Sequence, residues 1–530
     1  MKHIKKESFI KGILILFVSQ MVIKLLGLVY RVAITNLDGF GDNGNSYYGA
    51  AYQIYTVILA IATVGIPSAM SKLVAEKVAV GNTKGAHKIY RTGLTLFICI
   101  GLAGSLIMAV FAPAMANYVK NPGLEYSLWA LSPSVVLVAI SSVIRGYFQG
   151  YCNMKPQAVS QVIDQVVKCV FTILLAMAFV GQDAKVMAAA ATLGATIGTL
   201  VSMFYLIFYY CFKRKELKKL ISESENDEVE ERRKSIIKKI ISLSIPISFG
   251  AVITSMAGMV NLLTVIPRLL TIEGMTDERA RALYGIISGK SDTLLNLPLA
   301  INIAFATSLV PNISAALAVN DKKSAAKKIS FSIFCTILIV LPAAVGLSVL
   351  ADPLIKMLFR NASEGGYYLE VSAYAVIFMA LSQTLNGALQ GMGKVYVPAI
   401  AIISGAVVKY ISNYILVAIP EIEVMGAAYS SIICYFISAA ISFIALSRHL
   451  ELKLSFSKYI LKPIIAVVAM GASAYFSHYY LLNLIGSNTI ATLAAICIAV
   501  VIYGVMLLTL NIFDREELER IPIINKLLVK

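Results

Sequence analysis

Charged residues are scarce in this chain of 530 residues. Only 14% are charged and 58% are hydrophobic, whereas a soluble protein carries roughly 25% charged residues. Long apolar runs recur along the whole length. The composition therefore excludes an ordinary soluble protein and predicts an all-α polytopic membrane protein, because helices satisfy their backbone hydrogen bonds within lipid.

Carboxylates are scarcer than cations. The chain has 29 Asp and Glu against 46 Lys and Arg, a net charge of +17. In a soluble protein this excess would point to a nucleic-acid partner. Here the basic residues mostly lie between apolar runs, where they mark topology and contact anionic lipids. We therefore expect membrane lipids, and no nucleic acid, as partners.

Residues that build catalytic, metal and disulfide sites are few and scattered. The seven cysteines show no CxxC pairing, and the four histidines lie far apart without a second ligand at metal-binding spacing. No Walker-type glycine loop and no Ser-His-Asp arrangement occurs. We expect no enzyme activity, no metal and no cofactor. Because no ATP-binding motif is present, any transport by this chain would depend on an ion gradient or the membrane potential.

Long apolar runs are abundant. A helix needs about 20 apolar residues to cross a bilayer, and fourteen runs approach or exceed this length. The first follows a basic N-terminus, as a signal peptide does, but it is longer and has no clear cleavage site, so we expect a retained helix. The expected spans are 9–35, 47–70, 90–117, 126–150, 156–180, 186–212, 240–267, 283–318, 327–350, 367–391, 396–419, 424–447, 458–481 and 488–513.

The basic residues also predict the direction of these spans. If the N-terminus is inside, most Lys and Arg between spans fall in cytoplasmic segments, which agrees with the positive-inside rule. We therefore expect a multi-pass protein of the cell membrane with both termini in the cytoplasm. The longest cytoplasmic segment, 213–239, carries many charges of both signs and is expected to be a solvated linker.

An internal repeat divides the chain. The stretch "RGYFQGYCNMKPQAVSQVIDQVVK" (145–168) matches "NGALQGMGKVYVPAIAIISGAVVK" (386–409) in Gly, Gln, Gly and Val-Val-Lys at one constant offset. Segments 80–89 and 319–329 repeat at nearly the same offset. Because six spans separate the copies, they have the same orientation. The pattern predicts two six-helix lobes in parallel repeat, with two extra C-terminal helices.

The expected domains follow from the repeat and the charged linker. They are an N-terminal lobe at 1–212, the linker at 213–239, a C-terminal lobe at 240–447, and two extra spans with a cytoplasmic tail at 448–530.

Several cations lie inside the expected spans, where a charge costs several kcal/mol or more. Lys24 and Arg31 are seven residues apart and share one helix face. Lys168 and Lys409 lie near mid-depth at equivalent places in the two lobes. Such cations are typical of a water-filled cavity for an anionic substrate, and phosphates are the common bulky case.

Lys290 lies in the outer part of the eighth span and supports the same cavity, with Asp292 as the one carboxylate nearby. Some other charges have simpler alternatives. Arg268 closes the outer end of the seventh span and could instead reach the interface. Asp164 lies four residues before Lys168 and could neutralise it in an intrahelical ion pair. Arg145 is expected in a cytoplasmic turn that needs no special explanation.

Three stretches carry a family resemblance: "FIKGILIL", "GIPSAMSKLVAE" (65–76) and "SSVIRGYFQGYCNMKPQAVSQVIDQVVK" (141–168). Over most of its length the chain resembles the stage V sporulation protein B group of polysaccharide biosynthesis proteins. This group includes the MurJ-type lipid II flippases and belongs to the MOP exporter superfamily. The resemblance implies a flippase that moves an undecaprenyl-pyrophosphate-linked saccharide, first of all lipid II, to the outer leaflet for peptidoglycan or spore cortex synthesis. A monovalent cation gradient or the membrane potential would reset the carrier.

The resemblance carries over to single residues only in part. MurJ-type proteins have two arginines in an R-x-x-G-x-x-R pattern in the first span, where this chain has Lys24 and Tyr30, with Arg31 one place later. The Asp-Arg pair of the eighth span is here Asp292 and Thr293, and Lys290 is a substitute cation. The expected substrate-binding residues are Lys24, Arg31, Lys168, Arg268, Lys290, Asp292 and Lys409.

Two alternatives remain. A MATE-type, cation-coupled exporter of drugs or small molecules would have the same two-lobe plan, although it would more naturally carry buried carboxylates. A flippase for another lipid-linked polysaccharide unit would fit the departures from the MurJ pattern.

Overall fold

The computed structural model describes residues 9–60, 62, 65–222, 231–318, 320–394, 396–450, 452 and 455–512. These residues form helices and connecting turns, and no strand occurs among them. The all-α prediction is therefore confirmed. The helices are α1 (Phe9–Thr35), α2 (Gly41–Ala60), α3 (Ile66–Ala79), α4 (Thr83–Tyr118), α5 (Leu124–Gly150), α6 (Lys155–Ala178), α7 (Ala184–Ser222), α8 (Arg233–Leu269), α9 (Asp277–Gly285), the π-helical η2 (Ile286–Ser291), α10 (Asp292–Ala318), α11 (Lys322–Val349), α12 (Ala351–Leu358), α13 (Gly366–Ser372), α14 (Ala375–Gly391), α15 (Tyr396–Leu416), α16 (Met425–Ser447), η3 (Ser457–Leu461), α17 (Lys462–Ile485) and α18 (Asn488–Thr509).

Among the described residues, eleven helices are long and apolar enough to cross a membrane. The three expected spans outside this set correspond to α2 with α3, to α8, and to α9 through α10. Helix α2 is too polar to qualify because it carries side chains such as Asn45 and Ser46, both fully buried. The chain is a multi-pass membrane protein, and the count of fourteen stays a prediction.

The chain divides into two compact units. Unit 1 comprises residues 1–294 with 409–427, and unit 2 comprises 295–408 with 428–530. The lobe boundaries expected from the repeat stay a prediction. The middle of the charged linker (223–230) and the tail from residue 513 lie outside the described residues.

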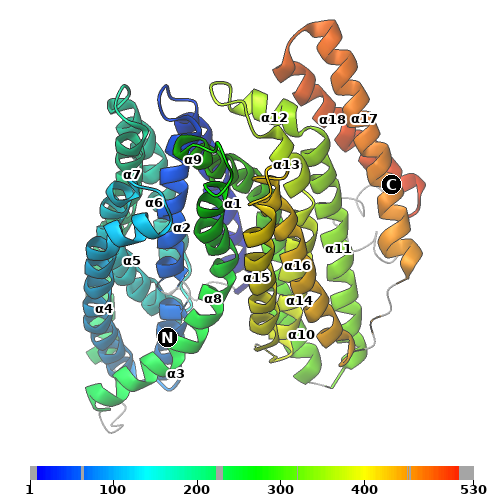
Figure 1. Cartoon of the computed structure of the whole chain (residues 1–530). Helices are drawn as coiled ribbons and strands as arrows, with labels where there is room; N and C mark the ends of the chain where they lie inside the picture. The colour runs from blue at the N-terminus through cyan, green and yellow to red at the C-terminus, as the bar shows by residue number, and fades with distance from the viewer. Residues whose placement is uncertain are drawn as a thin grey trace. The chain divides into compact units, whose positions relative to one another are not determined.

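Helix α2 is central to unit 1. It contacts α5 and α7 on one side and α8, α9 and η2 on another, while α1 runs along α6 (Figure 1). Its polar and aromatic side chains therefore face protein. This arrangement lets a helix of low hydropathy stay within a membrane-embedded bundle.

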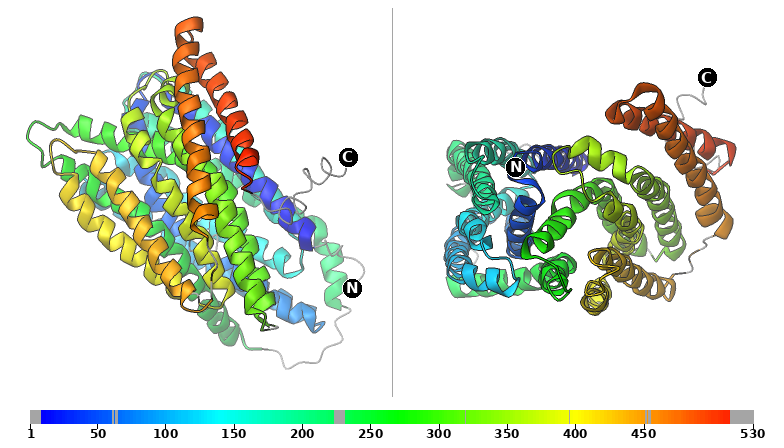
Figure 2. Two further views of the ribbon diagram at one scale, coloured as in Figure 1. Left: turned by 90° about the vertical axis from the view of Figure 1, so that its right-hand side faces the viewer. Right: turned by 45° about the horizontal axis from the view of Figure 1, so that its top comes forward.

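In unit 2, α17 and α18 form an adjacent pair that packs on α11, as both views in Figure 2 show. Gly471 of α17 permits this approach, since a Cβ atom there would lie 2.9 Å from the side chain of Val345. These two helices are the extra C-terminal helices expected from the sequence.

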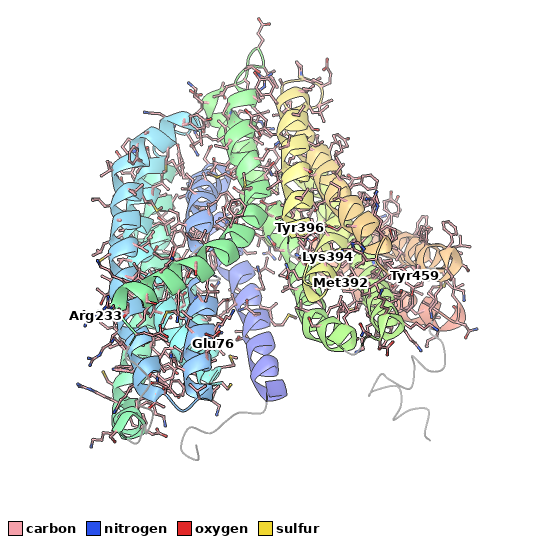
Figure 3. The ribbon with its side chains drawn as sticks, turned by 90° about the horizontal axis from the view of Figure 1, so that it is seen from below. Glu76, Arg233, Met392, Lys394, Tyr396 and Tyr459 are labelled. Atoms are coloured by element: carbon pink, nitrogen blue, oxygen red, sulfur yellow. The ribbon has the colours of Figure 1, made fainter. Side chains whose placement is uncertain are left out.

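The repeat is visible in local turn geometry. Cys152, between α5 and α6, has a φ of 58°, and Gly393, between α14 and α15, has a φ of 76°. The amide of each donates to a glutamine carbonyl, that of Gln149 at 2.8 Å and that of Gln390 at 2.9 Å. Lys394, labelled in Figure 3, ends the second turn. The two copies thus build the same left-handed turn.

The second pair of matching segments, 80–89 and 319–329, also shares its local geometry, because each contains a helix cap. Asn82 caps α4 by accepting from the amide of Gly85 at 2.6 Å, and Asp321 caps α11 by accepting from that of Ser324 at 2.9 Å. The ψ angles of the two capping residues are 74° and 75°. Equal caps at equivalent places support a structural repeat.

The repeated glycines also have one physical cause in both copies. A Cβ atom at Gly146 would lie 2.8 Å from the carbonyl oxygen of Pro67, and one at Gly387 would lie 2.5 Å from that of Ala306. Both glycines therefore allow one helix to approach the backbone of its neighbour, α5 on α3 and α14 on α10.

Candidate anion-binding site

The packing of α1 on α6 in unit 1 positions the first cations. Gln20 donates to Gln161 at 3.2 Å, and a Cβ atom at Gly27 would lie 3.8 Å from the Gln165 side chain. Lys24 lies between these contacts on the same helical face. It is partly buried and is close enough to Lys168 to interact electrostatically.

Lys168 of α6 is buried against tyrosine rings. Its Nζ donates to the hydroxyl of Tyr52 and lies 3.9 Å from the centroid of that ring and 5.0 Å from that of Tyr30. No ion pair between Lys168 and Asp164 occurs in the described part of the chain. The intrahelical neutralisation considered from the sequence is therefore not the main contact of this ammonium group.

Arg31 of α1 is held by α2 and η2. Its guanidinium donates to Asn45 Oδ1 and to the carbonyl oxygen of Ser288, both at 3.3 Å, and its Cζ lies 4.6 Å from the ring centroid of Tyr48. Thr35 donates to the Arg31 carbonyl at 2.7 Å. The partners of Arg31 and Lys168 named here are all neutral.

Asp292 connects two of the predicted cations. This carboxyl group is close enough to interact electrostatically with both Arg31 and Lys409. Lys409 is only 2% exposed, and its Nζ donates to the carbonyl oxygen of Ala257 at 2.9 Å. Residues from α1 and α15 thus lie within electrostatic reach of Asp292 of α10 in unit 1.

Lys290 and Arg268 have different surroundings. Lys290 is fully buried and forms an ion pair with Asp42 at 2.7 Å. Arg268 lies over the ring of Tyr414 at 4.0 Å and donates to the carbonyl oxygen of that residue at 2.9 Å. These contacts connect η2 to α2 and α8 to α15, which is typical of cations that stabilise helix packing.

Arg145 was not expected to matter, and its assignment to a turn is wrong. It lies within α5, is 6% exposed, and donates to Ser160 at 2.9 Å and to Ser202 at 3.1 Å. Asp164 lies within electrostatic reach of Arg145 and Lys168 and accepts from Thr199 at 3.4 Å. Asp164, which is partly buried, and Asp292, which is exposed, are therefore each close to two cations.

The tyrosines of α1 and α2 were also missed. Tyr48 and Tyr52 stack with ring centroids 5.5 Å apart and an interplanar angle of 6°, and Tyr30 lies 6.2 Å from Tyr48. The spacing of four residues in "YYGAAYQ" is the sequence signal for one shared helix face. The cluster of Tyr30, Tyr48 and Tyr52, here called the tyrosine cluster, lies between Arg31 and Lys168.

Comparison with known proteins agrees with this architecture. A family profile described as "Polysaccharide biosynthesis protein" matches residues 9–317, and one described as "Lipid II flippase MurJ" matches residues 286–511. Stage V sporulation protein B of Bacillus subtilis (strain 168) is 28% identical over 528 residues, covering 99% of this chain and all of that protein. Lipid II flippase MurJ of the same organism is 24% identical over 462 residues, covering 84% and 83%.

Two solved structures share the fold. The inward closed conformation of lipid II flippase MurJ superposes with a TM-score of 0.69 at 15% identity, covering 93% of this chain and 98% of that one. An inward-facing MATE multidrug resistance transporter of the MOP superfamily gives 0.68 at 16% identity, covering 82% and 98%.

Proposed function

The chain belongs to the polysaccharide biosynthesis protein family, and we propose that it is a flippase for an undecaprenyl-diphosphate-linked saccharide, with lipid II as the first candidate. The flippase proposal agrees with the group that holds stage V sporulation protein B and MurJ. The specific saccharide is part of the proposal.

The observation that carries the proposal is that Arg31 and Lys168 are buried among neutral partners. Both are buried, yet their contacts in the described structure are aromatic faces and neutral oxygens. A cation over an aromatic face gains only about 0.5–2 kcal/mol, and charge-assisted bonds to phosphate are roughly twice as strong as neutral hydrogen bonds. A diphosphate would therefore displace the present partners readily.

In the proposed cycle, the diphosphate binds to Arg31 and Lys168, with Lys24 nearby, while the polyprenyl chain stays in lipid. Lys409, Asp292, Lys290 and Arg268 keep the surrounding helices in place. The carrier then releases the headgroup at the outer leaflet, and no covalent bond changes. A monovalent cation gradient or the membrane potential would return the empty carrier to its starting state. Both termini of the chain would lie in the cytoplasm.

A MATE-type exporter is the second candidate, because such a transporter shares the fold. A cationic substrate would need a carboxylate that is available to it. In unit 1, however, Asp164 lies near Arg145 and Lys168, and Asp292 lies near Arg31 and Lys409. Carboxylates that each lie near two cations are weak sites for a cationic substrate, which favours the flippase.

Complementation tests the proposal directly. The protein is expressed in a bacterium whose only lipid II flippase can be switched off, and lipid II accessible at the outer surface is measured. We expect rescue by the wild type and loss of rescue in Arg31→Ala and Lys168→Ala, with equal amounts of protein in the membrane. Failure of the folded wild type would exclude lipid II and leave another lipid-linked saccharide as the cargo to test.

A further inference from the structure

Two rings of the tyrosine cluster, those of Tyr48 and Tyr52, lie beside the cations of the proposed diphosphate site. Tyr48 and Tyr52 lie one helical turn apart on α2, and their rings are nearly parallel. Each ring is covered by a different cation, Tyr48 by Arg31 at 4.6 Å and Tyr52 by Lys168 at 3.9 Å. Two flat aromatic surfaces therefore lie directly beside the two cations to which the diphosphate is proposed to bind.

Binding of a diphosphate would change what these rings contact. Because the phosphate oxygens attract Arg31 and Lys168 more strongly than the ring faces do, the cations would move off the rings. The ring faces of Tyr48 and Tyr52 that these cations now cover would then be free. An apolar surface that is uncovered in this way favours a ligand with an apolar face of its own.

A saccharide joined to a diphosphate supplies that face. The first sugar ring is bonded directly to a phosphate oxygen, so it lies within one ring width of the group that binds the cations. The C–H face of a pyranose ring packs on aromatic rings as other apolar groups do. The ring centroids of Tyr52 and Tyr48 lie 3.9 and 4.6 Å from the cations, so a sugar next to the bound phosphate would lie within reach of both rings.

We propose that Tyr48 and Tyr52 form a saccharide-stacking subsite for the first sugar of a glycosyl diphosphate. This inference rests on the proposed function and narrows the substrate class to diphosphates that carry a pyranose ring. The subsite would let the carrier distinguish a loaded lipid from the same polyprenyl diphosphate without sugar. Arg31 and Lys168 alone could not make that distinction, because both lipids present the same diphosphate.

Direct binding tests the inference. The full chain in lipid nanodiscs is titrated with undecaprenyl diphosphate and with undecaprenyl diphosphate linked to N-acetylglucosamine. We expect the wild type to bind the sugar-bearing lipid about 10-fold more tightly. In Tyr48→Leu and Tyr52→Leu this preference should fall to about 2-fold or less, while the affinity for the sugar-free lipid stays within about 3-fold.

Tyr55 provides a matched control. It is a buried tyrosine on the same helix, and its ring packs edge-to-face with that of Tyr52, with centroids 5.7 Å apart. No cation lies over the Tyr55 ring in the described structure. Tyr55→Leu should keep the preference for the sugar-bearing lipid. Tyr52→Phe, which keeps the ring and removes only the hydroxyl, should keep it as well.

The outcomes separate the two proposals. If neither lipid binds the wild type, the proposed function itself is wrong. If the wild type binds both lipids equally, or if Tyr52→Leu weakens both equally, the stacking subsite is wrong and the flippase proposal stands. Should the leucine variants fail to fold, photocrosslinking of the wild type decides, because a diazirine on the sugar should label residues 41–60. Labels confined to other segments would overturn the inference.

Discussion

Lys290 and Asp42 form an ion pair of 2.7 Å in which the lysine side chain is fully buried. The pair joins η2 to the first turn of α2, where glycines let the two backbones come close. A Cβ atom at Gly285 would lie 1.8 Å from the carbonyl oxygen of Asp42. Removing either charge would break this ion pair at a site where the lysine side chain is fully buried.

We therefore expect Lys290→Met and Asp42→Asn to destabilise the protein by about 3–5 kcal/mol. Lys356 and Asp352 form a matched control, since they also pair, at 2.6 Å, but with side chains more than half exposed. Lys356→Met should cost about 0–1 kcal/mol. Thermal unfolding of the purified variants measures both effects. Normal stability of Lys290→Met with lost transport would instead make Lys290 a substrate ligand.

Lys24 and Arg31 should be needed for transport and not for folding. We expect Lys24→Ala and Arg31→Ala to abolish outward movement of the lipid without lowering the amount of protein in the membrane. Arg31→Lys should restore only part of the activity, because an ammonium group cannot bind two phosphate oxygens at once as the planar guanidinium can. Flippase assays with quantified protein test this, and full activity in both alanine variants would contradict it.

The glycines of the repeat should have similar roles in both copies. Gly146→Ala and Gly387→Ala would each bring a methyl group against a backbone oxygen at 2.8 and 2.5 Å, so both should lower the unfolding temperature by comparable amounts. Gly346, inside α11, faces open space, since a Cβ atom there would meet no neighbouring atom within 4 Å. Gly346→Ala should therefore be neutral or stabilise by about 1 kcal/mol. Opposite effects of the two repeat glycines would argue against a shared role.

The ion pairs of Glu231, near the start of α8, predict that the stability of the protein depends on pH. Its carboxylate accepts from Lys239 at 2.9 Å and pairs with Lys77 of α3 at 3.3 Å. The bond from Lys239, and secondly that from Lys77, hold the pKa of Glu231 below its ordinary value. Glu76 of α3 and Arg233 of α8 mark this end of the two helices in Figure 3.

A carboxyl group with a lowered pKa in the folded state stabilises that state above its ordinary pKa, about 4.3 for glutamate. The contribution is lost as the pH falls through the lowered value. Glu231→Gln should lower the thermal midpoint slightly at pH 7 and flatten its decline below about pH 4.5. The measurement is the midpoint as a function of pH for both proteins, and identical curves would exclude the contribution.

Repeats and turns were readable from the sequence because they depend on local chemistry. A left-handed turn at Gly393 and a cap at Asp321 involve residues a few positions apart, so matching segments predict matching turns. Apolar runs predict membrane helices for the same reason. Arg145 was misjudged because its burial and its hydrogen-bond partners depend on Ser160 and Ser202, which belong to two other helices.

The sequence by itself determined that this is an all-helical membrane protein with an internal repeat and with cations in its spans. Those properties follow from composition and from spacing along one chain. Only the tertiary structure decided which cations are held by neutral partners and which are neutralised. Lys168 meets Tyr52 from 116 positions away, and Lys290 meets Asp42 from 248 positions away. The partner of a buried charge is set by helix packing, and no local pattern in the sequence encodes it.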